Sequence, residues 1–225
     1  MKTKPTLTTV CTCLCVSWLF LASGRNVEAT STSRVPSRPS VSIVIDTKTK
    51  TLNLYVHHRL FHTYPVALGK DTTPTPVGNW IIIQRGRDWG SGFGTRWLGL
   101  NVPWGIYGIH GTNRPTSIGH LASGGCIRMH NSDVEEVYER VRIGTPVSIL
   151  GDPLYPLRSL EDGHVGADVR LVQDRLWRLG FYHGPLHGRY DEATIAAVKA
   201  FEQKLGLPVD GVVSERDYRA LGLIE

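Results

Sequence analysis

Cysteine is scarce in this chain of 225 residues, which contains four in all. Three of them, Cys11, Cys13 and Cys15, lie close to the N-terminus, and only Cys126 follows. The chain beyond its N-terminal segment therefore cannot form an internal disulfide. An unpaired cysteine is either a buried, unreactive residue or a reactive thiol, and the residues around Cys126 must decide between the two.

Long apolar runs and basic clusters are also missing. No stretch after residue 30 approaches the length of a membrane span. Basic residues do not alternate with aromatic ones in one cluster, so nucleic-acid binding is not indicated. Cys126 and the nine histidines show no Cys/His spacing typical of zinc ligands, and we expect neither a metal nor another cofactor.

The first 29 residues have the layout of a secretory signal peptide. Lys2 and Lys4 give a basic start, residues 10–22 form a short apolar run, and a cleavage motif with small or β-branched side chains at Val27 and Ala29 follows. An uncleaved membrane anchor is the alternative. Residues 30–40 are rich in Ser, Thr and Pro and predict a linker. We expect an exported, cell-wall-associated protein without stable membrane insertion after cleavage.

The remaining chain has an ordinary globular composition. Hydrophobic residues make up 41% and charged residues 20%, and the length suits one medium and one small domain. The formal net charge is +5, and the loss of three basic and one acidic residue with residues 1–29 leaves a mild positive balance. Such a balance suits an anionic polymer.

Short alternating segments predict a β-rich domain over residues 41–150. The expected strands cover residues 42–45, 51–56, 60–66, 80–83 and 146–150, and their spacing is typical of a β-sandwich or barrel. A capping box formed by Ser132 and Glu135 predicts one helix within this domain. Residues 84–97 are Gly-rich and carry aromatic side chains, which predicts a mobile loop.

The pattern becomes helical after Leu150. Two helical faces are expected, each ended by a glycine, and a third short helix begins at Ser214 with Asp217 three residues later. The first face comprises Val169, Val172, Leu176 and Leu179, and the second comprises Ile195, Val198, Phe201 and Leu205. The sequence therefore predicts a small three-helix domain over residues 160–225, after a linker at 151–159.

The residues around Cys126 favour a reactive thiol. A thiol must lose its proton to attack a carbonyl, and His110, at the end of an expected strand, could take that proton. Gly124 and Gly125 let backbone N–H groups converge on a developing oxyanion. Arg128 supplies a positive charge for a substrate carboxylate. His120 is an alternative base in the same region.

Residues 41–150 resemble the L,D-transpeptidase catalytic domain along their length. The resemblance is carried by Gly69-Lys70 and by residues 75–78, 94–100, 109–112 and 123–128. It implies a mainly β, sandwich-like fold in which Cys126 is the nucleophile and His110 the base, oriented by the backbone carbonyl of Gly111. Ser123, Gly124, Gly125 and Arg128 would bind substrate. Gly124 stands where many members have a histidine.

Residues 160–222 resemble the three-helix peptidoglycan-binding domain. The resemblance is carried by residues 169–173, 179–182, 196–198 and 207–211, with His187-Gly188 in place of the usual Asp-Gly. It implies peptidoglycan as the partner, and an unspecialised interaction module is the alternative. Because no nucleophile or base follows residue 160, we expect this domain to hold the enzyme at the wall rather than to shape its active site.

Together the two resemblances imply a cysteine acyltransferase of cell-wall biogenesis. The thiolate would attack a donor stem tetrapeptide, D-alanine would leave, and an acceptor amine would resolve the thioester into a cross-link. Two alternatives stay open. Water could be the acceptor, which would give an L,D-carboxypeptidase, or the chain could be a non-catalytic wall-binding protein.

Overall fold

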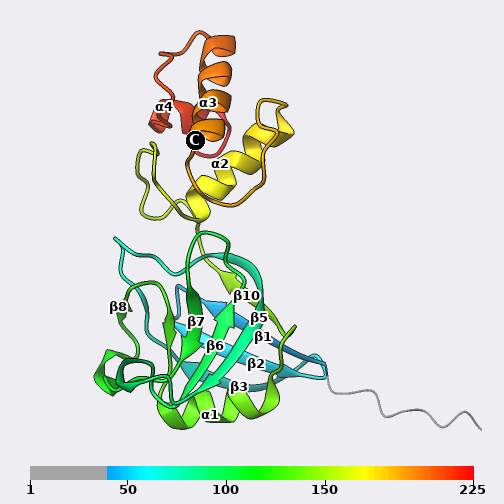
Figure 1. Ribbon diagram of the computed structural model, residues 1–225, viewed down its shortest axis with the longest axis vertical. Helices are drawn as coiled ribbons and strands as arrows, with labels where there is room; N and C mark the ends of the chain where they lie inside the picture. Colours follow the sequence, from blue (N-terminus) through cyan, green and yellow to red (C-terminus); the bar gives the residue numbers. More distant parts are fainter. Residues whose placement is uncertain (1–39) are drawn as a thin grey trace, which may run out of the picture. The chain divides into compact units, whose positions relative to one another are not determined.

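The computed structural model describes residues 40–225, so the predicted signal peptide and nearly all of the predicted first linker lie outside the described residues. The described chain belongs to one compact unit, Arg38–Glu225. Its strands and helices are drawn in Figure 1. The strands are β1 (Val41–Asp46), β2 (Thr51–Val56), β3 (Arg59–Pro65), β4 (Leu68–Gly69), β5 (Gly78–Arg87), β6 (Arg96–Leu100), β7 (Tyr107–His110), β8 (Leu121–Ser123), β9 (Ile127–Arg128) and β10 (Pro146–Leu150). The helices are η1 (Ser91–Phe93), η2 (Pro115–Ser117), α1 (Asn131–Arg140), α2 (Ala167–Arg178), α3 (Glu192–Leu205) and α4 (Glu215–Ala220).

One mixed sheet dominates the first part of the chain, in the order β3-β2-β1-β10-β5-β6-β7-β9. Strand β10 inserts between β1 and β5 and runs parallel to β1, and β9 runs parallel to β7. Strands β4 and β8 form a separate small sheet. The predicted fold class, a mainly β catalytic domain followed by a helical domain, is confirmed.

The sheet curls until its two edges meet. Just beyond the edge strand β3, Ala67 exchanges two backbone hydrogen bonds of 2.9 Å with Arg128 in β9, at the opposite edge. A flat sheet of eight strands would hold its edges about 30 Å apart. Helix α1 spans the closure, since it packs against β6 and β7 while its Glu136 accepts a hydrogen bond from the Tyr64 hydroxyl of β3.

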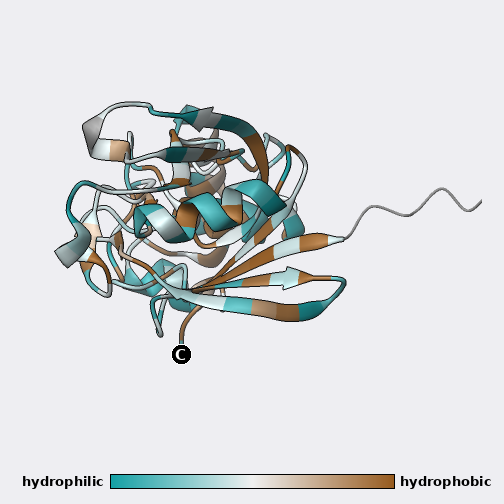
Figure 2. Cartoon of the chain, turned by 90° about the horizontal axis from the view of Figure 1, so that it is seen from below, coloured by the Kyte–Doolittle hydropathy of each residue, from teal (hydrophilic) through white to brown (hydrophobic). Residues whose placement is uncertain are grey.

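Hydrophobic and hydrophilic residues alternate along strands that bury one face, such as β2 and β10, and Figure 2 colours the chain by this property. Strands β6 and β7 are instead buried on both faces. Two local predictions need correction. Strands β5 and β6 take up both ends of residues 84–97, so the loop between them is shorter than predicted. Helix α1 is preceded by His130 as N-cap, and Ser132 makes no cap.

Helices α2, α3 and α4 surround a second hydrophobic core. Gly206 ends α3 in the left-handed conformation, and the capping box of Ser214 and Asp217 opens α4, both as predicted. Leu179 and Leu205 were expected on the buried faces but are 42% and 51% exposed, because each lies at the C-terminal end of its helix. None of the helices within residues 40–225 is long and apolar enough to cross a membrane.

Candidate active site

The parallel pairing of β7 with β9 brings the predicted nucleophile and base to one face of the sheet. Ile109 lies opposite Ile127 in the register, and both side chains are fully buried in the core. Side chains alternate along a strand, so His110 and Cys126 point away from that core on the same side. Cys126 directly precedes β9, and His110 lies opposite Arg128 in the register, so these residues, 16 positions apart in the sequence, share one face of the sheet.

The His110 imidazole is enclosed by aromatic rings. It stacks on Trp97, with ring centroids 5.7 Å apart, and meets Phe93 edge-on at 5.1 Å. Its Nδ1 lies 2.5 Å from the Gly111 carbonyl oxygen, the contact that the resemblance implied. A carbonyl oxygen can only accept, so Nδ1 carries the proton and Nε2 is left as the basic nitrogen.

Burial keeps both members of this pair uncharged at rest. It lowers the pKa of His110 to about 4, and the nearby charge of Arg128 acts in the same direction. Burial also raises the pKa of the Cys126 thiol, although hydrogen bonding with the Gly108 backbone and the charge of Arg128 oppose it. Near neutral pH the resting state is therefore a thiol beside a neutral imidazole, and not a thiolate–imidazolium pair.

Internal hydrogen bonds shape the loop that carries Cys126. The Ser123 hydroxyl is buried, donates to the Cys126 carbonyl at 2.6 Å and accepts the Gly125 N–H at 3.0 Å. Ser123 therefore shapes the loop, and the Gly125 N–H is already engaged. The N–H groups of exposed Gly124 and of Cys126 are the better candidates for oxyanion donors.

Arg128 lies beside the pair with part of its guanidinium uncommitted. Its Nη1 donates to the Ala122 carbonyl over 3.4 Å, whereas its Nε is buried and has no hydrogen-bond partner within residues 40–225. A buried donor without a partner calls for an explanation, and a substrate carboxylate would supply one. His120 lies instead in the exposed turn before β8.

Two His-x-x-x-His spacings, His58–His62 and His183–His187, were overlooked in the sequence argument against a metal. Neither lies on a helix, where this spacing would place both rings on one face. Within residues 40–225 no group of three or more His, Cys, Asp or Glu side chains is arranged to hold a metal ion.

Asn131 is a residue of the site region that sequence reasoning missed. Its Oδ1 accepts hydrogen bonds from the backbone N–H groups of Thr95, at 3.3 Å, and Thr112, at 3.1 Å. It leaves no room for a side chain at Gly94 or Gly111. Asn131 thus ties the loop over His110 to the segment that follows it. The only signal in the sequence was its position next to the start of the predicted amphipathic helix.

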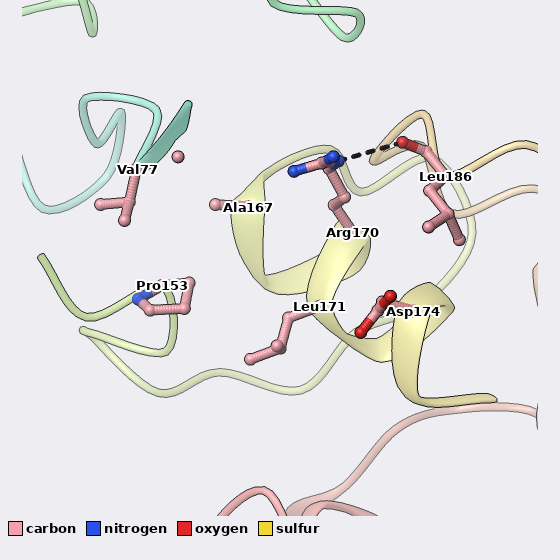
Figure 3. Close-up of a pocket in the computed structure, with 8 residues that line it drawn as sticks. Val77, Pro153, Ala167, Arg170, Leu171, Asp174 and Leu186 are labelled. Carbon is pink, nitrogen blue, oxygen red and sulfur yellow. Dashed lines mark hydrogen bonds between the residues drawn. The ribbon is translucent and has the colours of Figure 1, made fainter. Parts of the chain in front are cut away.

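The cavity drawn in Figure 3 lies elsewhere. It measures about 320 Å³ and is lined mainly by apolar residues, with Arg170 and Asp174 from α2. None of the predicted site residues lines it, so the candidate active site is defined by the strand pairing and the loop of Cys126 rather than by this cavity.

Two known protein families match this chain, one in the β-rich region and one in the helical region. Residues 40–149 match the model of the "L,D-transpeptidase catalytic domain", and residues 165–221 match that of a "Putative peptidoglycan binding domain". The matched regions contain the curled sheet with Cys126 and His110, and the three helices of the second core.

Three Bacillus proteins are among the relatives. "Putative L,D-transpeptidase YkuD" of Bacillus subtilis is 50% identical over 107 residues, which is 48% of this chain and 64% of that protein. Its namesake from Bacillus licheniformis is 47% identical over 116 residues, covering 52% and 69%. "Putative L,D-transpeptidase YqjB" of Bacillus subtilis is 32% identical over 125 residues, covering 49% and 71%.

The alignments thus span roughly two thirds of each relative's length. They define the class of this protein: the chain belongs to the L,D-transpeptidase family. Within that family it is a member whose catalytic domain is followed by a peptidoglycan-binding domain.

Proposed function

We propose that this protein is an exported peptidoglycan L,D-transpeptidase, with residues 41–150 as the catalytic domain and residues 160–225 holding it at the cell wall. The observation that carries the proposal is the pairing of β7 with β9, which sets Cys126 and His110 on one face of the sheet in a chain of this family. Residues 1–29 would serve as the signal peptide.

In the first step the Cys126 sulfur attacks the carbonyl that joins the diamino acid of a donor stem to its terminal D-alanine. Nε2 of His110 accepts the thiol proton as the carbon–sulfur bond forms, which suits the neutral imidazole that burial maintains. The same proton passes to the D-alanine nitrogen as the carbon–nitrogen bond breaks. The N–H groups of Gly124 and Cys126 stabilise the oxyanion.

In the second step an acceptor amine attacks the thioester. His110 takes a proton from that amine and returns it to the sulfur, so that an amide cross-link forms and the thiol is restored. The positive charge of Arg128, with its unpaired Nε, holds a carboxylate of the stem peptide close to the thioester. Water in place of the amine would give the carboxypeptidase reaction.

Product analysis tests the proposal. Residues 30–225 are incubated with a purified disaccharide-tetrapeptide, and the products are separated by liquid chromatography and weighed by mass spectrometry. Released D-alanine with a cross-linked dimer is the expected result, and Cys126→Ala serves as the control. D-alanine with a tripeptide alone would assign the carboxypeptidase reaction, and neither product from a folded chain would contradict the proposed function.

A further inference from the structure

Tyr107, the first residue of β7, packs directly against the loop of the nucleophile. Gly125 has φ +113°, and a Cβ placed on it would lie 2.6 Å from Cε1 of the Tyr107 ring. On the other edge of the ring, a Cβ on Gly105 would lie 2.8 Å from Cε2. The ring thus occupies the space beside two glycines, one of them adjacent to Cys126, and limits how the nucleophile loop can move.

The ring of Tyr107 packs in turn against the ring of Trp104. The Trp104 side chain is 5% exposed, and its ring meets that of Tyr107 at 67° with centroids 6.5 Å apart. Trp104 also contacts the ring of Trp80 in β5, edge-on at 5.3 Å. Aromatic rings in such edge-to-face arrangements attract one another and hold a defined geometry. A displacement of the Trp104 ring would therefore change the position of the Tyr107 ring.

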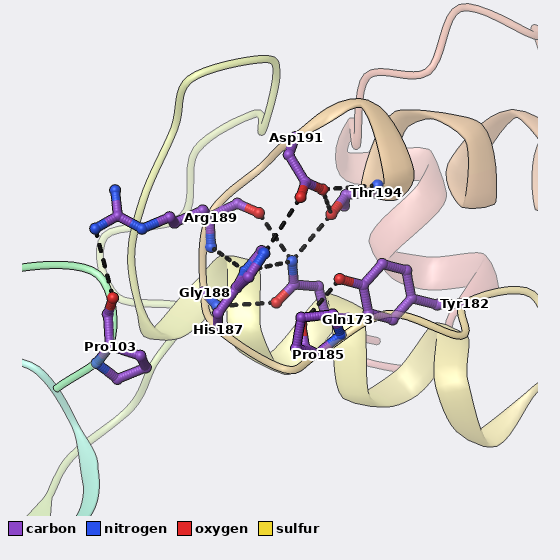
Figure 4. Close-up of polar contacts among 9 residues, drawn as sticks. All are labelled: Pro103, Gln173, Tyr182, Pro185, His187, Gly188, Arg189, Asp191 and Thr194. Carbon is purple, nitrogen blue, oxygen red and sulfur yellow. Dashed lines mark hydrogen bonds and ion pairs between the residues drawn. The ribbon is translucent and has the colours of Figure 1, made fainter. Parts of the chain in front are cut away.

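The loop before α3 contacts this aromatic pair. A Cβ on Gly188 would lie 2.5 Å from Cε3 of Trp104, so the backbone of Gly188 packs closely against the indole ring. The neighbouring Arg189 donates from Nη2 to the Pro103 carbonyl at 3.4 Å (Figure 4). Position 188 has φ +67°, a conformation in which glycine is favoured, so both the space and the backbone require it.

The same loop is fixed from within the helical domain by a buried amide. Gln173 of α2 accepts the Gly188 N–H at 2.9 Å and donates to the Arg189 carbonyl at 2.8 Å (Figure 4). Its side chain is completely buried, which makes the pairing costly to break. The surface offered to Trp104 is therefore rigid and not a chance contact of a flexible loop.

We propose that Tyr107 is a positioning residue for the Cys126 loop. Gly188 and Arg189 of the helical domain hold Tyr107 in place, Gly188 through its contact with Trp104 and Arg189 through its hydrogen bond to Pro103. This inference rests on the proposed function. It departs from the sequence expectation that the helical domain leaves the active site alone. The helical domain would then serve twice, as a wall-binding module and as part of the support of the nucleophile.

The electrostatics of Tyr107 agree with this arrangement. Burial raises the pKa of its phenol, hydrogen bonding with Trp104 lowers it, and the charges of Cys126 and Arg189 act on it with opposite sign. The phenol thus lies within electrostatic range of both the nucleophile and the helical domain.

Variants of the full chain test the inference with two readouts, the pH midpoint of Cys126 alkylation by iodoacetamide and kcat against KM for a soluble tetrapeptide donor. Tyr107→Ala should loosen the loop, move the alkylation midpoint toward that of a free thiol and lower kcat about tenfold, with KM within about twofold. Tyr107→Phe, which keeps the ring, should resemble the unaltered protein in both.

The contact from the helical domain is tested at the exposed Arg189. Arg189→Glu should shift both readouts in the same direction as Tyr107→Ala but by less, whereas Arg216→Glu, at an exposed position of α4, should shift neither. Thermal melts identify variants that remain folded. Folded Tyr107→Ala and Arg189→Glu proteins with an unshifted alkylation midpoint would overturn the inference. Alkylation needs no peptidoglycan, so a chain that labels as expected but releases no D-alanine would contradict only the proposed function.

Discussion

At the scale of single residues, burial decides how the candidate pair is charged before substrate arrives. The rings of Trp97 and Phe93 cover His110, and burial lowers its pKa to about 4. The thiol of Cys126 is also buried enough for its pKa to rise. The proton therefore moves during attack, and the thiol is protected from general electrophiles until a substrate is positioned.

Alkylation of Cys126 should reveal this resting state. Iodoacetamide reacts with the thiolate, and a raised thiol pKa keeps the thiolate fraction low at neutral pH. The rate should climb about tenfold per pH unit from roughly pH 6 to pH 8, with a midpoint above the ordinary value of 9.0. A rate that is already constant across this range would indicate a thiolate–imidazolium pair and contradict the resting state described above.

Substitution of the two histidines separates the candidate bases. His110→Gln should lower turnover of a soluble donor about a hundredfold or more, because a general base typically contributes that much. His120→Gln, in an exposed turn, should leave turnover within about twofold. Both rates are measured on variants whose thermal melts match the unaltered protein. A larger loss in His120→Gln would reverse the assignment of the base.

At the scale of secondary structure, local patterns predicted strands β1, β2, β3, β5 and β10 and several helix ends, but not strands β4, β6, β8 and β9. Alternation predicted β2 over the residues that the structure assigns to it, and Ser214 with Asp217 predicted the start of α4. These signals depend on residues a few positions apart, which a sequence displays directly. The insertion of β10 between β1 and β5 depends on pairs such as Ile43 with Val147 and Pro146 with Ile81, far apart in the sequence, so no local pattern could indicate it.

The start of α1 shows why one local signal was wrong. Ser132 and Glu135 have the spacing of a capping box, but the helix begins at Asn131, whose side chain accepts hydrogen bonds from Thr95 and Thr112. These long-range bonds set the position of the chain before the helix. The pairing of Cys126 with His110 was reached through resemblance, since their adjacency also depends on strands that only the fold brings together.

Removal of the Asn131 amide should therefore weaken the catalytic domain. Asn131→Ala deprives two backbone N–H groups of their acceptor, which should lower the free energy of unfolding by about 1 to 3 kcal/mol. Ser132→Ala, the neighbouring substitution at an exposed position, should change it by less than about 0.5 kcal/mol. Urea unfolding gives both values. Equal effects of the two substitutions would mean that Asn131 does not tie the loops together.

At the scale of the whole molecule, two hydrophobic cores serve different purposes in one chain. The first core supports the sheet that carries Cys126, and the second is formed by the three helices of the region that matches a peptidoglycan-binding domain. Attachment of a second binding site to the same polymer raises the effective concentration of the enzyme at its substrate. This gain in effective concentration is the role that the proposed function gives to the helical domain.

Binding to insoluble wall measures that role. The full chain carrying Cys126→Ala, which cannot form a thioester, should co-sediment with purified sacculi about tenfold more strongly than residues 30–151 carrying the same substitution. The concentration that gives half-maximal co-sedimentation is compared for the two proteins. Equal values would show that the helices add no affinity for the wall, whatever they contribute to the active site.

The central claim is that Cys126 forms a thioester with the donor stem. Intact-protein mass spectrometry after brief incubation with a disaccharide-tetrapeptide tests it most directly, with peptide mapping to locate the adduct. The account predicts a mass increase equal to the mass of the donor less that of the released D-alanine, located on Cys126, removed by hydroxylamine and absent from Cys126→Ala. D-alanine release that persists in Cys126→Ala, or an adduct on another residue, would contradict it.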